Sequence, residues 1–238
     1  MPRQVSAPST TAVRNRLLAA LRPADLELLL PHLKPVDLPL RHSLEAAGQA
    51  IDNVYFLESG IASVVAVDSR GRRIEAGIIG NEGMTGVSLV LGADSSPNET
   101  FIQIAARGHR IAARRIREAM QASATLREMF LRFANAFMVQ TTQTALANGR
   151  GRVEERLARW LLMARDRVED DSLPLTHEFL ALMLGVRRSG VTVALHELEG
   201  AGFVKSIRGV VIVRDRSGLE RLAAGFYGVA EAELGRLL

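Results

Sequence analysis

The stretch that most constrains the fold is residues 175–198, where two short amphipathic segments meet at a single glycine. Thr176 stands where its hydroxyl can cap a first helix, and Gly185 follows that helix where a left-handed turn is needed. A second helix is predicted to begin near Arg187. Apolar residues recur at three- and four-residue spacing along both helices: Phe179, Leu180, Met183, Leu184, Val191, Ala194, Leu195 and Leu198. This pattern is typical of a helix-turn-helix.

The residues after the second helix support this interpretation. Strand-like runs at 203–206 and 210–213 flank a predicted hairpin turn at 207–209, and a hairpin in this place is a wing. The alternative, two core helices that merely flank a glycine, is weaker once the wing is included. The start of the second helix and the wing are rich in hydrogen-bond donors, so we predict these DNA contacts: Thr176, Arg187, Arg188, Ser189, Thr192, Lys205 and Arg208.

Residues 36–113 have a different sequence pattern, with short apolar and β-branched runs separated by turn residues. Strands are predicted at 53–57, 61–67, 74–79 and 101–105, with turns at 58–60, 68–71 and 80–83. A helical lead-in at 17–33 precedes them. Short strands at such intervals indicate an antiparallel sandwich or jelly roll.

The periodicity then becomes helical, with a short helix predicted at 114–120 and a long one at 125–146. One face of the long helix carries a four-three stripe, a row of residues spaced alternately four and three positions apart: Leu126, Phe130, Phe133, Phe137, Gln140, Thr144 and Ala147. Such a stripe is typical of a two-helix coiled coil, whereas the alternative is packing on the chain's own sheet. We favour the coiled-coil dimer, because Gln140 and Thr144 suit a dimer seam better than a buried core.

A hinge is predicted at 148–151, where two glycines surround a polar pair. Another amphipathic helix follows at 152–167. The acidic loop Glu169-Asp170-Asp171 comes next, and we interpret it as a solvated turn, with a contact to a partner such as RNA polymerase as the alternative.

Composition excludes several kinds of site. The chain has no cysteine, which excludes disulfides, thiolate zinc sites and cysteine-ligated iron–sulfur clusters. The histidines lack metal-ligand spacing: His32, His42, His109, His177 and His196. With no clear acid/base pair either, we predict no enzyme, no cofactor and no metal site.

The 238 residues, 47% of them hydrophobic, suffice for two domains, and we expect no membrane span. Residues 1–16 lack the apolar segment of a secretory signal, so we expect a flexible arm and a cytoplasmic protein. A net charge of +4 is modest, so any interaction with DNA depends on local placement of charge.

In this order, the parts resemble the Crp/Fnr superfamily of bacterial transcription regulators, from about Leu17 to the C-terminus. The resemblance implies an α+β fold with a double-stranded β-helix (jelly roll), a dimerisation helix and a winged helix-turn-helix. It implies a homodimer on a palindromic operator in double-stranded DNA, a small-molecule effector in the β-roll and contact with RNA polymerase. The corresponding division is a flexible arm at 1–16, a cyclic-nucleotide-binding-like β-roll at 17–121, a dimerisation helix at 122–148 and the DNA-binding domain at 149–238.

The residues that the resemblance assigns to the effector pocket depart from the members that bind cyclic AMP. Val87 stands in place of the ribose-binding glutamate, and Asn98 in place of the phosphate-binding arginine, with Glu99 beside it. The bulky Phe137 and Met138 replace hydroxyl side chains. The candidate pocket therefore comprises Gly86, Val87, Ser88, Asn98, Glu99, Thr100, Phe137 and Met138. We predict no tight binding of cyclic AMP, because a charge-assisted phosphate contact is lost.

At the DNA end the match is partial. Arg188 corresponds to the family's guanine-reading arginine, whereas Ser189 replaces a glutamate that many members have, and Val193 replaces a second arginine of some members. We therefore expect an operator that differs from the well-known half-sites. Two alternatives remain for regulation: a cyclic nucleotide in a rearranged pocket, or a constitutive regulator that needs no effector.

Overall fold

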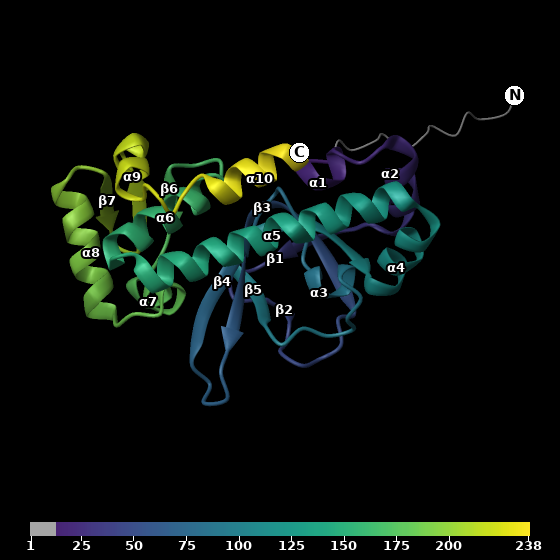
Figure 1. Ribbon diagram of the computed structural model, residues 1–238, viewed down its shortest axis with the longest axis horizontal. Coiled ribbons are helices and arrows are strands. Elements are labelled where there is room, and N and C mark those ends of the chain that lie inside the picture. Colours follow the sequence, from purple (N-terminus) through teal and green to yellow (C-terminus); the bar gives the residue numbers. More distant parts are fainter. Residues whose placement is uncertain (1–12) are drawn as a thin grey trace, which may run out of the picture.

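The computed structural model describes residues 13–238, so most of the predicted N-terminal arm lies outside the described residues. Figure 1 shows a β-roll under a long helix, with a smaller helical and stranded unit at one end. The first half of the described chain contains α1 (Arg16–Ala19), α2 (Pro23–Leu29), η1 (Leu30–His32), β1 (Lys34–Leu38), β2 (Ser43–Glu45), β3 (Asn53–Val67), β4 (Arg73–Ile79), α3 (Val87–Val90), β5 (Glu99–Ala112) and α4 (Ala113–Ala122). The second half contains α5 (Ala124–Arg150), α6 (Val153–Arg165), β6 (Ser172–Pro174), α7 (His177–Leu184), α8 (Arg188–Gly200), β7 (Val204–Ile207), β8 (Val210–Val213), α9 (Arg216–Leu222) and α10 (Val229–Leu237).

The chain is fixed to the β-roll (β1–β5) from Asn15 onward. The buried Asn15 side chain caps α1 by accepting from the Leu18 N–H at 3.0 Å. Its amide group donates to the carbonyl oxygens of Leu57 at 2.7 Å and Gly83 at 2.8 Å. The predicted helical lead-in is divided into α1, α2 and η1, and Pro23 begins α2 at a position where its missing N–H costs nothing.

The roll is one antiparallel sheet in the order β1-β5-β3-β4, with β2 also paired to β5. The prediction of an antiparallel β fold is confirmed, but the predicted turn at 58–60 is wrong. β3 continues through it as a bulge, where Gly60 has φ 74° and lies so close to β5 that a Cβ would collide with the Ile104 and Ala105 carbonyl oxygens. The predicted turn at 68–71 is confirmed, with Asp68 accepting from the Arg70 and Arg72 N–H groups.

α5 packs on the roll of its own chain, so the predicted coiled-coil seam is wrong and its alternative is correct. Leu126, Phe130 and Phe133 are buried in one apolar cluster with residues of the roll, and the Phe130 and Phe56 ring centroids are 6.1 Å apart. The polar member Gln140 is explained by an edge contact, because it accepts from the Ile78 N–H at 2.7 Å and donates to the Ile78 carbonyl at 3.2 Å.

The predicted hinge at 148–151 is largely helical. α5 continues through Arg150, and only Gly151 and Arg152 separate it from α6. The Gly151 N–H donates to the Ala147 carbonyl at 2.8 Å, and the Arg152 N–H donates to the Glu155 carboxylate at 2.8 Å. Both ends of the break are therefore tied by local hydrogen bonds, and the turn is short and defined.

The C-terminal unit packs α6, α7, α8 and α9 against a three-stranded sheet in the order β6-β8-β7. The predicted wing is confirmed as β7 and β8, with the first strand shifted by one residue. No single helix in residues 13–238 is long and apolar enough to cross a membrane, and α7 with α8 meets that criterion only as a bent pair.

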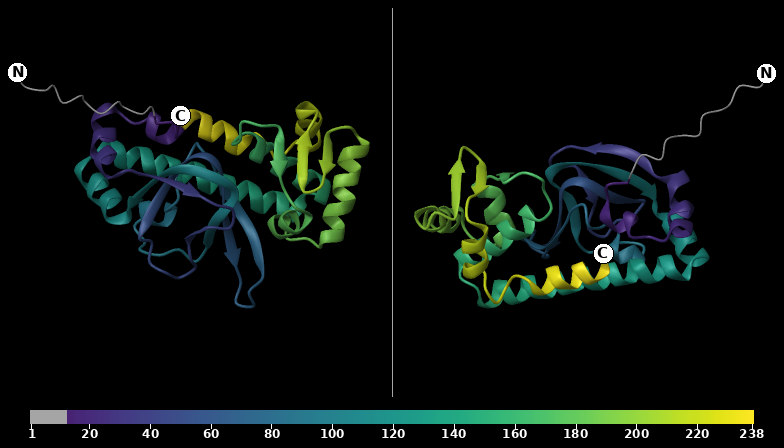
Figure 2. Two further views of the ribbon diagram at one scale, coloured as in Figure 1. Left: turned by 180° about the vertical axis from the view of Figure 1, so that it is seen from behind. Right: turned by 90° about the horizontal axis from the view of Figure 1, so that it is seen from above.

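The C-terminal helix α10 was not predicted, and it returns from the C-terminal unit to the roll. It lies along α5, as Figure 2 shows from above. Leu237 joins the buried cluster that contains Leu17 and Leu18, and the Asn135 amide donates to Glu233 at 3.2 Å. α10 therefore covers a second side of α5 and ties the two ends of the molecule together.

We expect Phe130→Ala to lower the free energy of unfolding by about 3–5 kcal/mol, because it removes a fully buried ring from the contact between α5 and the roll. Urea unfolding followed by circular dichroism measures this. The exposed control Arg114→Ala on α4 should change the value by less than about 0.5 kcal/mol. Equal small losses in both variants would contradict the packing described for α5.

Candidate nucleic-acid interface and effector pocket

The two helices of the predicted helix-turn-helix meet as expected. Thr176 accepts from the Phe179 N–H at 3.2 Å, and Gly185 ends α7 with φ 60°. α7 and α8 are bent by 104°, within the range of DNA-binding helix pairs. All apolar residues predicted for the inner face of α8 are buried: Val191, Ala194, Leu195 and Leu198. The opposite face of α8 therefore points outward.

Donors cluster at the exposed start of α8. Arg187, Arg188 and Ser189 are all exposed, and the Arg188 side chain is 69% accessible. Its guanidinium lies 3.8 Å from Glu178, a long surface ion pair that solvent screens. Arg188 is thus available to an acceptor outside the chain.

Thr192 differs from the other predicted contacts because its hydroxyl is used inside the motif. It donates to the Arg188 carbonyl at 3.2 Å and lies 3.0 Å from His177 Nδ1 on α7. This contact holds α7 against α8. Val193, the next residue of α8, is 58% exposed and presents an apolar side chain to the solvent.

The wing extends this surface. β7 packs beside α8 (Figure 1), and the Ser206 N–H donates to Glu199 on α8 at 2.6 Å. Lys205 and Arg208 are exposed on the hairpin, with Arg208 in its turn at φ 43°. Two separate elements therefore present guanidinium and ammonium groups on adjoining exposed surfaces, where phosphate contacts are made in winged proteins.

Residues 155–222 match the sequence profile of the Crp-like helix-turn-helix domain. This part of the chain is a Crp-like helix-turn-helix domain. The match covers the end that carries α6 to α9, which includes both the helix pair and the wing. The predicted resemblance to Crp/Fnr regulators is thereby confirmed for this domain.

Most of the chain shares the fold of solved Crp/Fnr-type regulators. FixK2 from Bradyrhizobium japonicum superposes with a TM-score of 0.70 at 18% identity, covering 81% of this chain and 98% of that one. A CRP-family transcriptional regulator from Thermus thermophilus gives 0.65 at 21% identity, covering 81% and 97%. The c-di-GMP responsive regulator CLP from Xanthomonas campestris gives 0.62 at 19% identity, covering 81% and 99%. No curated protein matches the sequence.

The Crp-like domain is docked on the roll through a buried polar contact that the sequence did not predict. Glu75 on β4 is 4% exposed and accepts from Trp160 Nε1 on α6 and from the Ser63 hydroxyl, both at 2.6 Å. Burial raises the pKa of Glu75 to about 7, although these hydrogen bonds and the charges of Arg159 and Arg167 oppose the shift. A carboxylate in an apolar strand was the available signal, but its partner lies 85 residues away.

A second buried contact lies at the end of α6. Arg167 Nε donates to Glu82 at 2.7 Å, and both side chains are no more than 5% exposed. Arg167 also donates to the Met163 carbonyl at 2.8 Å, and Glu82 accepts from the Gly80 N–H. Since an unpaired buried charge is costly, each partner fixes the other, and with it the position of α6 on the roll.

The acidic loop is partly neutralised by its own chain. Asp171 pairs with Arg165, and Glu169 pairs with Arg14 at 2.5 Å. Asp170 stays exposed without an ion pair among residues 13–238. These contacts favour the interpretation of the loop as a solvated turn.

In the predicted effector pocket, a carboxylate of the chain itself accepts hydrogen bonds from two of the donor groups. Glu45 on β2 accepts from the Gly86 N–H at 2.6 Å and from the Thr100 hydroxyl at 2.9 Å. Burial raises the pKa of Glu45, and these hydrogen bonds oppose the shift. Val87 and Ser88 lie on α3 directly after Gly86.

The remaining pocket residues are distributed over different surroundings. Phe137 packs against the apolar interior of the roll, and Asn98 bonds through its N–H to Ser96. Glu99 pairs with Arg73 at 2.5 Å. Met138, also predicted for the pocket, is 58% exposed on α5. The described chain contains no group of three or more metal-ligating side chains.

We expect the stability of the protein to fall as the pH rises from about 5 to about 8. The folded-state pKa of Glu75 lies above its ordinary value of 4.5, so its contribution is fully present below that value and lost as the pH rises through about 7. In Glu75→Gln, the decrease in the free energy of urea unfolding over this pH range should be smaller than in the wild type by on the order of 2 kcal/mol. The exposed control Glu118→Gln should keep the slope of the wild type. An unchanged slope in Glu75→Gln would contradict a protonated carboxyl at the domain contact.

Proposed function

We propose that this chain is a sequence-specific DNA-binding transcription regulator. The observation that carries the proposal is the exposed N-terminal turn of α8, with Arg187, Arg188 and Ser189 free of strong partners beside the wing. Arg188 reads a guanine, and Lys205 and Arg208 contact phosphate. RNA polymerase is the expected protein partner, as the resemblance implies.

We propose further that the active form is a homodimer on a palindromic operator, joined through the exposed face of α5. The stripe that sequence analysis assigned to the dimer is largely buried within one chain, but a second stripe with the same four- and three-residue spacing is exposed. It contains Glu128, Leu131, Asn135, Met138, Thr142 and Ala145. Leu131 is 41% and Met138 58% exposed, and a second copy of α5 would bury both. α5 pairing along this stripe would place two copies of α8 about a two-fold axis.

The roll is not proposed to bind cyclic AMP. Glu45 already holds the Gly86 N–H and Thr100 hydroxyl, and a phosphate would have to displace a carboxylate and then face its charge. The interior of the roll is filled by apolar side chains, with Phe137 packed against them. These contacts favour regulation from another site, or an effector-independent regulator, over a cyclic nucleotide in a rearranged pocket. The neighbour CLP is c-di-GMP responsive, which makes that dinucleotide a ligand to include in any test.

Arg188→Ala and Arg208→Ala should affect DNA binding in different ways. Arg188→Ala should remove preference at one guanine per half-site, a loss of about 1–3 kcal/mol on the selected operator and little on random DNA. Arg208→Ala should weaken both DNAs alike and lower the salt slope by about one. The operator is first selected from a random pool, and affinities are measured by fluorescence anisotropy at several stated salt concentrations. Equal losses on both DNAs for Arg188→Ala would refute the assignment.

Met138→Glu should separate the dimer, because it replaces an apolar contact of the stripe by two like charges placed together. Sedimentation should shift from a dimer to a species near the 25.9 kDa of one chain, and operator affinity should fall at least about tenfold. The matched control Arg114→Glu on exposed α4 should remain dimeric. A Met138→Glu protein that stays dimeric would exclude this face of α5 as the interface.

A further inference from the structure

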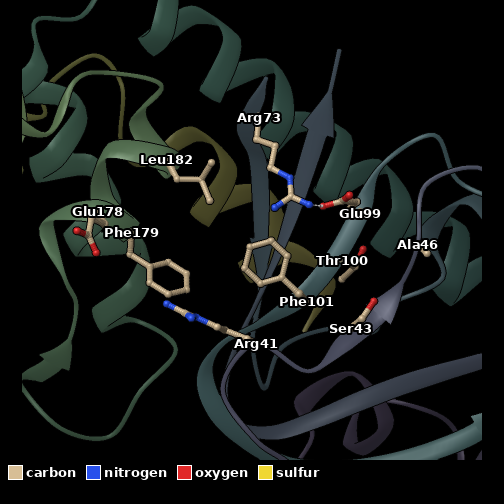
Figure 3. Close-up of a pocket in the computed structure, with 10 residues that line it drawn as sticks. All are labelled: Arg41, Ser43, Ala46, Arg73, Glu99, Thr100, Phe101, Glu178, Phe179 and Leu182. Carbon is tan, nitrogen blue, oxygen red and sulfur yellow. Dashed lines mark ion pairs between the residues drawn. The ribbon is translucent and has the colours of Figure 1, made fainter. Parts of the chain in front are cut away.

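A pocket of about 500 Å³ lies between the roll and the Crp-like domain, a volume typical of small-molecule sites. Figure 3 shows its two walls. The roll contributes Arg41, Arg73 and Phe101, and α7 contributes Glu178, Phe179 and Leu182. It adjoins the predicted effector pocket, because Glu99 and Thr100 also line it, but its second wall comes from the Crp-like domain.

The apolar part of the pocket is formed by two aromatic rings. Phe101 on β5 and Phe179 on α7 have ring centroids 6.4 Å apart and planes tilted by 49°. Both side chains are only half-buried, and Leu182 lies beside them. Two half-exposed rings in contact with each other offer a flat apolar group an aromatic surface to pack against.

Four charged residues line the pocket, Arg41, Arg73, Glu99 and Glu178, and Arg41 is the cation available to a ligand. Its guanidinium lies 5.9 Å from the centre of the Phe179 ring and forms no ion pair within residues 13–238. Arg73, by contrast, is already paired with Glu99. The Arg41 backbone has φ 67°, a conformation uncommon for a residue other than glycine, and its N–H donates to the Ile102 carbonyl at 2.7 Å. The backbone is thus held where the side chain reaches across the pocket (Figure 3).

We propose that this interdomain pocket binds a small organic anion with a flat aromatic ring, its anionic group on Arg41 and its ring packed against the Phe101–Phe179 pair. A guanidinium without a carboxylate partner suits a carboxylate, sulfonate or phosphate, and the aromatic pair suits the ring.

A ligand in this pocket touches both domains, so it changes the energy of any state in which they separate or rotate. Glu178 on the α7 wall also lies 3.8 Å from Arg188, which places the pocket one side chain away from the proposed guanine contact. The ligand would therefore act as the effector. This regulatory part rests on the proposed function, whereas the binding part does not.

Binding is tested without DNA, using anilinonaphthalene sulfonate as the probe, an aromatic anion whose fluorescence rises in apolar sites. We expect saturable binding to the full chain and about tenfold weaker binding to Arg41→Gln, since one charge-assisted contact is lost. The control Arg114→Gln removes an exposed arginine from α4 and should bind as the wild type does. Phenylnaphthylamine, the same ring system without the sulfonate, should bind both Arg41 forms alike.

A second variant, Ala46→Trp, fills the pocket from its rim without touching Arg41 and should also weaken the probe. Equal urea midpoints for the variants and the wild type establish that they are folded. Unsaturable binding, or equal affinities for wild type and Arg41→Gln, would overturn the site.

Regulation is tested separately, by measuring affinity for the selected operator with and without the probe. A change of at least threefold in the wild type, absent in Arg41→Gln, supports an effector role. Binding of the probe with unchanged operator affinity overturns that role and leaves the site intact. Failure to select any operator would count against the proposed function, and the titration without DNA would still decide the site.

Discussion

The arrangement of this molecule depends on the buried carboxyl group of Glu75. It stands on a strand of the roll, yet one of its two donors, Trp160 Nε1, belongs to the Crp-like domain. A buried carboxyl that loses a donor pays the cost of desolvation without compensation. Separating the domains at this point therefore costs free energy. The Arg167 to Glu82 pair imposes the same condition at the other end of α6.

α5 links these contacts to the proposed interface because its sides face different surroundings. One side is buried on the roll through Phe130 and Gln140, and another is covered by α10, which returns from the C-terminal domain. The remaining stripe around Met138 is exposed. Because two sides of α5 are packed against the rest of the chain, the position of the helix is fixed. A dimer formed through its exposed side would therefore hold two recognition helices at a set distance.

The location of the proposed effector site follows from the same packing. Inside the roll, Glu45 and Phe137 occupy the place that a ligand would use. Between the domains, Arg41 and the Phe101–Phe179 pair leave space and an unpaired charge. A ligand bound between two domains directly affects their relative orientation. A ligand bound inside one domain affects it only indirectly, by changing the structure of that domain.

Features that depend on local spacing could be predicted from the order of the residues alone. Thr176, Gly185 and the apolar residues of α8 define the helix pair within a few turns of chain, and the wing follows from the two short runs around Arg208. The alternation of short strands and turns likewise predicted an antiparallel roll. In each case, the partners that satisfy the backbone are close in sequence, so periodicity and capping suffice.

Which surface packs against which is seen only in the folded chain. A four-three stripe on α5 fits a coiled coil and a core equally well, and the choice fell to the roll because Ile78 offers Gln140 both a donor and an acceptor. Gly60 became a bulge because β5 passes too close for a side chain. The pairing of Glu75 with Trp160, the capture of Thr100 by Glu45 and the return of α10 join residues far apart in the chain. Spacing along a sequence carries no record of such distant partners, since it specifies which residues share a face but not what that face will meet.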